Sequence, residues 1–105
     1  MTRRIFKPDA ERPYFETPAH IPPGSDHQIP HSHRCLYQGY DMIVHMTGYE
    51  YESLGKTLWA MAVEVVRDQQ IVVPAQVDQD RHYASVQEAA TQGVAWGRRI
   101  VDELH

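Results

Sequence analysis

The strongest pattern of hydrophobic and polar positions lies near the carboxyl end of the chain. From residue 85 to 104, apolar side chains recur every three or four residues, which is the period of an amphipathic helix. Ser85 and Glu88 have the spacing of a capping box, in which each side chain accepts a free backbone N–H of the first turn. The pattern therefore predicts one long helix that begins after Ser85.

Two glycines, Gly93 and Gly97, lie four residues apart in the apolar stripe of this helix. Each costs about 1 kcal/mol of helix propensity relative to alanine, so a close approach to another element is the natural compensation. We expect large side chains of a sheet to fill the space over both glycines, with Val94 and Trp96 at the flanks.

Alternation with a period of two predicts three strands, at residues 40–47, 58–67 and 71–77. Residues 48–56 are interpreted as an exposed loop. Pro74 cannot donate a ladder hydrogen bond, so the third strand is an edge or bulged strand. The short connections favour an antiparallel meander, and the predicted fold is α+β: a three-stranded antiparallel sheet with the carboxyl-terminal helix packed on one face.

The predicted sheet has one bulky face and one smaller, mixed face. The helix should cover the bulky face, because side chains such as Trp59 and Met61 fit over its glycines. The other face would stay open, either as a surface for self-association or partner binding or as an ordinary solvated face. Its candidate interaction residues are Ile43, His45, Leu58, Ala60, Ala62 and Val72.

Prolines divide the chain into two parts. Six of the seven precede residue 31, so residues 1–33 are interpreted as an extended or disordered tail and residues 34–105 as the domain. Two alternatives stay open for the tail, plain disorder or wrapping around the domain. The apolar anchors for wrapping would be Ile5, Phe6, Tyr14, Phe15, Ile21 and Ile29.

Composition narrows the classes of function. The net charge of −4 without a basic stripe argues against nucleic-acid binding, and no apolar run is long enough to span a bilayer. A single cysteine, Cys35, excludes an internal disulfide. We expect a soluble cytoplasmic protein whose small core favours association into a homodimer.

The only ligand-type group in the sequence is His27, His31, His33 and Cys35. In an extended chain, residues 31, 33 and 35 project from one side, as ligands of zinc or copper would. The spacing matches no established metal signature, so weak adventitious binding is the alternative, and no cofactor is predicted.

No arrangement in the sequence carries a strong catalytic signal. Asp78, Asp80, His82 and Tyr83 precede the helix, where a structural role explains them, and Cys35 lacks an oriented base and an oxyanion pocket. We therefore predict that the protein is not an enzyme.

The assembled pattern resembles a family of small uncharacterised bacterial β-β-β-α proteins. The matching residues are 37–40, Trp59 with Ala60 and Val63, Val73-Pro74, and 83–89 with the helix from Gly93 to Gly97. This resemblance implies the fold and no reaction. Residues 85–89 are also similar to the helix start of HicB-type antitoxins, although the Pro-rich turn of that family is absent here.

Three hypotheses for function follow. The first is a non-catalytic interaction module that self-associates through an open sheet face or a strand edge. The second is a metal-binding or metal-sensing protein that uses the segment from His27 to Cys35. The third, from the second resemblance, is a HicB-like antitoxin or regulatory partner.

Overall fold

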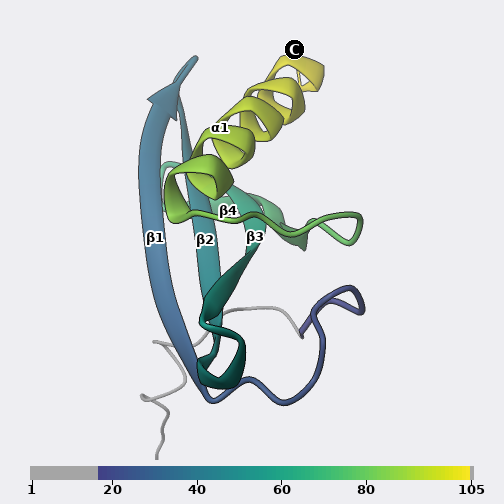
Figure 1. The fold of residues 1–105 in the computed structure, drawn as a ribbon. Helices are drawn as coiled ribbons and strands as arrows, with labels where there is room; N and C mark the ends of the chain where they lie inside the picture. Colours follow the sequence, from purple (N-terminus) through teal and green to yellow (C-terminus); the bar gives the residue numbers. More distant parts are fainter. Residues whose placement is uncertain (1–16, 105) are drawn as a thin grey trace, which may run out of the picture.

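A computed structural model describes residues 17–104 of the chain, and its architecture is a single antiparallel sheet with one helix across it (Figure 1). The sheet order is β1-β2-β3-β4, so each strand pairs with its neighbour in sequence. The α+β class and the carboxyl-terminal helix are confirmed, whereas the prediction of three strands is wrong because there are four. The elements are β1 (His27–Tyr37), β2 (Tyr40–Tyr51), a 3-10 turn η3 (Glu52–Leu54), β3 (Lys56–Arg67), β4 (Gln70–Val77) and α1 (Val86–Glu103).

The additional strand is β1, whose first seven residues fall in the segment interpreted as a tail. It pairs with β2 without interruption, from His27 opposite Glu50 to Tyr37 opposite Tyr40. The connecting residues Gln38 and Gly39 both have positive φ, 54° and 82°. Such a two-residue turn is the type I′ turn that matches the twist of a β-hairpin, so it fixes the register of β1. Of the rest of the predicted tail, residues 17–26 precede β1 in the structure, whereas residues 1–16, with the proposed anchors Ile5, Phe6, Tyr14 and Phe15, lie outside the described residues.

The hairpin of β2 and β3 is longer than predicted, because residues 48–51 continue β2 instead of forming an exposed loop. Tyr49 and Tyr51 are buried, and Gly48 lies against the indole of Trp59, where a Cβ would come within 2.9 Å of the ring carbon Cζ2. Glycine is therefore required at this position for the tryptophan to lie flat across the strand pair.

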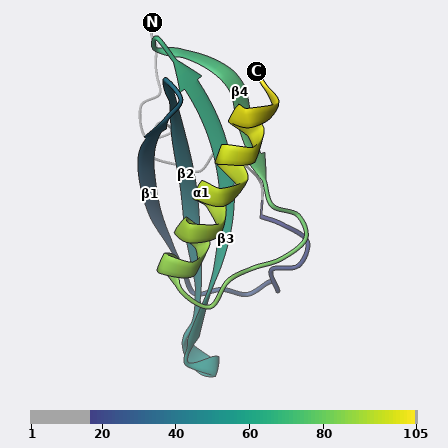
Figure 2. The same ribbon diagram turned by 90° about the horizontal axis from the view of Figure 1, so that it is seen from above.

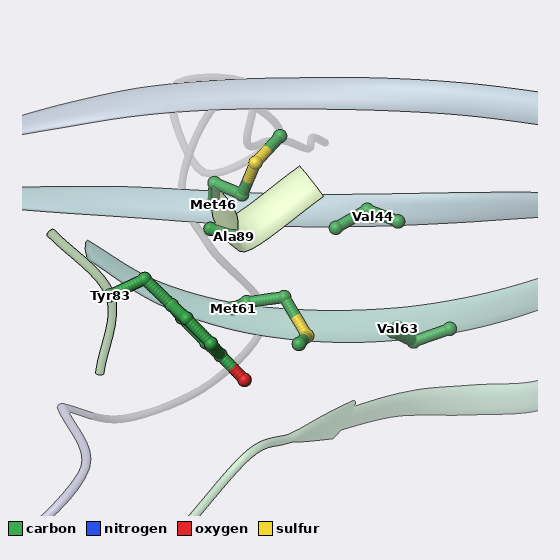
Figure 3. Close-up of a cluster of buried hydrophobic side chains, with 6 residues drawn as sticks. All are labelled: Val44, Met46, Met61, Val63, Tyr83 and Ala89. Atoms are coloured by element: carbon green, nitrogen blue, oxygen red, sulfur yellow. The ribbon is translucent and has the colours of Figure 1, made fainter. Parts of the chain in front are cut away.

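Helix α1 lies across β2 and β3 on the face that carries the bulky side chains, as predicted (Figure 2). Val44 and Met46 of β2 and Met61 and Val63 of β3 form the core beneath it (Figure 3). The two helix glycines face this core, since a Cβ at either position would meet the side chains of the sheet. The expected close approach of helix and sheet is therefore confirmed, and Met61 lies over Gly93 as expected. Trp59, however, lies over Gly48 of β2 instead of a helix glycine.

The helix start follows the capping box with one difference. The Ser85 hydroxyl accepts from the N–H of Glu88 at 3.1 Å, as expected, while the Glu88 carboxylate accepts from the N–H of Ala84 at 3.2 Å rather than from Ser85. The hydrogen bond to Glu88 therefore comes from the residue before Ser85 and holds the loop that leads into the helix.

The two outer strands of the sheet differ in regularity. The register between β3 and β4 shifts twice, on either side of Val65, and Pro74 lies at one of these irregularities. The prediction of an edge or bulged strand is therefore confirmed in both respects. Strand β1 has no register shift along its eleven residues.

Candidate functional site

The second sheet face, predicted to be open, is covered in part in the structure. Ala60 and Ala62 have 0% of their surface exposed, so two of the six proposed interaction residues have no accessible surface. Part of the cover is Ile21, which packs against Tyr49, Tyr51 and Ala60. Ile21 therefore acts as one of the anchors considered for a wrapping tail, and the open-face interpretation needs correction.

The other four candidate interaction residues retain some exposure. Ile43, His45 and Leu58 are half-buried, and Val72 is exposed on β4. The ring Nε2 of His45 lies 2.8 Å from Oε1 of Glu64, and these side chains are only 18% and 7% exposed. This hydrogen-bonded pair satisfies a carboxylate that would otherwise be costly to bury, so it explains both residues structurally.

The loop before the helix borders a hollow of about 480 Å³, lined in part by Asp80, Arg81, Trp96 and Arg99. The half-buried Asp78 in its lining is engaged, since its carboxylate accepts from the Tyr83 hydroxyl at 2.8 Å and from the N–H of Asp80 at 2.9 Å. Burial is the main cause that raises the pKa of Tyr83 to about 12, and the hydrogen bond to Asp78 is the second cause. These two hydrogen bonds hold the loop in place and give Asp78 and Tyr83 a structural role.

The most accessible strand is β1, one of the two outer strands of the sheet (Figure 1). Nine of its eleven residues are exposed, and Leu36 is 71% exposed. Because the type I′ turn closes on Tyr37 and Tyr40, the odd-numbered residues of β1 exchange hydrogen bonds with β2. The even-numbered residues therefore point their backbone groups away from the sheet.

Pro30 is consistent with this arrangement. It has an even number, so the N–H that it lacks would have pointed outward, and its presence costs no bond to β2. The outward-facing residues with an N–H to donate are Gln28, Ser32, Arg34 and Leu36.

The side chains of the predicted metal set are spread along this strand. His31 and His33 lie on the helix side of β1, where His33 borders a hollow of about 510 Å³ together with Ala90, Val94 and Arg98 of the helix. The Nε2 of His27 lies 3.1 Å from Oε2 of Glu52. Cys35 is half-buried next to the core around Met42. Within residues 17–104, no three His, Cys, Asp or Glu side chains come together to hold a metal ion.

The carboxyl-terminal end of β1 is tied to the helix. The Tyr37 hydroxyl donates to Oδ1 of Asp102 at 2.9 Å, and the guanidinium of Arg98 lies 5.5 Å from the centre of the Tyr37 ring. These contacts fix the end of β1 relative to α1 while its middle, around Ser32, stays exposed. Sequence reasoning missed this strand, although the short Gln-Gly turn after Tyr37 was an available signal for a hairpin.

The described part of the chain contains no helix that is both long and apolar enough to cross a membrane. Comparisons of the sequence with protein-family models and with curated proteins, and of the structure with solved structures, find no match. We therefore infer function from the geometry of the sheet and its exposed edge.

Proposed function

We propose that this protein is a small non-catalytic interaction module that forms a homodimer by pairing the β1 strands of two chains. The observation that supports it is β1 itself, a regular outer strand that is exposed on most of its length. A strand of this kind presents a row of backbone donors and acceptors, which another strand can satisfy by extending the sheet.

A second copy of the same chain fits this edge well. The midpoint of His27–Tyr37 is Ser32, so two antiparallel copies overlap completely when Ser32 faces the partner subunit's Ser32. Five facing pairs of outward residues then form roughly eight inter-chain hydrogen bonds, since Pro30 of each chain lacks one donor. The edge is thus complementary to itself about a two-fold axis.

Charge supports the same partner. The chain carries a net charge of −4, yet β1 contains no acidic residue, and Arg34 is its only permanently charged side chain. In the complete overlap Arg34 faces the partner subunit's Pro30 rather than another arginine. Two copies of this negatively charged protein therefore meet along a strand that has no carboxylates to repel each other.

The experiment is light scattering coupled to size-exclusion chromatography on the full chain over a range of concentrations. We expect a dimer that is lost in Ser32→Pro, which removes an outward N–H at the two-fold axis without removing a bond to β2. Ser32→Lys should also dissociate the dimer, because two ammonium groups would face each other. The matched control Ser32→Thr should remain dimeric.

Circular dichroism and thermal unfolding show whether each variant keeps its fold. A wild-type chain that is monomeric at every concentration, with and without added divalent metal ions, would overturn the proposal. A dimer that survives in folded Ser32→Pro and Ser32→Lys would likewise show that the interface is not the edge of β1.

A further inference from the structure

The histidines of β1 form a ligand set that one chain leaves incomplete. His31 and His33 project from the same face of an exposed strand, about 7 Å apart along the chain. Two imidazoles supply half of the four ligands of a tetrahedral zinc site. No third ligand-type side chain among residues 17–104 completes the set in a single chain.

Edge pairing would supply the missing ligands. When Ser32 faces the partner subunit's Ser32, His31 faces the partner subunit's His33, and His33 faces the partner subunit's His31. The even-numbered residues form the inter-chain hydrogen bonds, so these histidine pairs occupy the narrow, non-hydrogen-bonded positions. There the Cα atoms are only about 4.5 Å apart and the side chains are closest. Four imidazoles gather around the two-fold axis on one face.

We propose that pairing of two β1 strands creates a metal site in which His31 and His33 of both chains bind one divalent transition-metal ion. Imidazole ligands of this kind suit zinc, copper or nickel. The inference rests on the proposed dimer, because the site exists only where the two strands meet. Only two of the four predicted ligands take part in this site. His27 would face the partner subunit's Tyr37 and Cys35 would face the partner subunit's Ile29, so neither lies among the four imidazoles.

The surroundings keep this site accessible. A two-fold axis perpendicular to the sheet leaves both α1 helices on the histidine side, one on each flank of the paired strands. The hollow beside His33 is bordered by Ala90 and Val94, whose short side chains leave room above the imidazoles. Added metal can therefore enter from solvent, and a chelator can remove it.

The test combines zinc titration by calorimetry with light scattering, on the full chain before and after zinc addition. We expect one zinc ion per two chains, removal by EDTA, and at least a tenfold loss of affinity in the His31→Ala, His33→Ala double variant. Both side chains are exposed, so the variant should keep its fold and, without metal, its edge pairing. His27→Ala is the matched control and should bind zinc as the wild type does.

The outcomes separate this inference from the proposed dimer. A dimer that binds no zinc, or that binds it equally well in the double variant, would overturn the metal site and leave the edge pairing intact. A monomer that becomes a dimer only with zinc, and only with both histidines present, would support the site and make pairing metal-dependent. One zinc per chain, unchanged in folded Ser32→Pro, would overturn the shared site, and a monomer under all conditions would overturn both proposals.

Discussion

Replacement of Gly93 by alanine should destabilise the protein although alanine favours helices. An added Cβ at Gly93 would overlap Cγ1 of Val44 and come within 2.9 Å of Cγ2 of the same residue. Val44 is fully buried on an inner strand, and its β-branched side chain has little rotamer freedom. At Gly97 the nearest atom is instead Sδ of Met42, at 2.9 Å, which belongs to a flexible side chain.

These contacts set the size of the effect. Alanine gains about 1 kcal/mol of helix propensity at either position. Overpacking against a rigid neighbour costs about 1–3 kcal/mol, and the overlap with Val44 places Gly93→Ala near the upper end. We therefore expect a net loss of about 1–2 kcal/mol for Gly93→Ala. For Gly97→Ala we expect a change between zero and about 1 kcal/mol in favour of folding, because Met42 can move.

Urea unfolding at one fixed chain concentration measures both free energies, since any dimerisation makes stability depend on concentration. Val44→Ala in the Gly93→Ala background is the matched test, because it removes the Cγ atoms of Val44 that the added Cβ at position 93 would overlap. The double variant should be more stable than the sum of the single effects by about 1 kcal/mol or more. If Gly93→Ala is as stable as the wild type, or if the two glycine variants behave alike, the packing argument is wrong.

Three further changes test other parts of the structure. Tyr83→Phe should cost about 1–2 kcal/mol near neutral pH through loss of the hydrogen bond to Asp78. The pKa of Tyr83 is about 12 in the folded state and 10.0 ordinarily, so its contribution to stability is complete below pH 10 and is lost as the pH rises toward 12. Urea unfolding should therefore show a smaller loss of stability between pH 10 and 12 in the variant than in the wild type. Gln69→Gly should raise the free energy of unfolding by about 0.5–1 kcal/mol, because Gln69 has a φ of 66° in the turn between β3 and β4 and glycine adopts a positive φ without strain. A lower midpoint in thermal unfolding would contradict this. Ile21→Ala should cost about 2–4 kcal/mol and speed proteolytic cleavage before β1, whereas an unchanged unfolding curve would show that the contact with Tyr51 is energetically neutral.

The helix and its site of contact could be predicted from sequence because the buried positions are apolar residues that recur with the period of a helix or a strand. Gly93 and Gly97 mark the face of α1 that approaches the sheet, and Met61 marks the face of β3 that receives it. The tyrosines of β2 show how the same signal can be misread. Tyr49 and Tyr51 alternate with Glu50 and Glu52 as a half-buried strand should, but the same run after Gly48 is also typical of an exposed loop, which is how the sequence alone is interpreted.

Strand β1 could not be predicted from hydrophobic alternation because both of its faces are exposed. It is held by its hydrogen bonds to β2 and by the Tyr37 contacts with the helix, neither of which leaves a pattern in composition. The same applies to the cover over Ala60, since one isoleucine among prolines gives no periodicity. The candidate residues chosen by alternation alone therefore included Ala60, which Ile21 of the same chain covers.

The unequal outer strands of the sheet also bear on how far any assembly of this protein can grow. A fibre that grows by strand pairing needs two unpaired strand edges on every unit, one to join the growing end and one to accept the next unit. Here the side formed by β4 is kinked twice and interrupted by Pro74, which makes it a poor template for a further strand. In the dimer proposed above, only these interrupted sides would remain outermost, so we expect growth to stop at two chains.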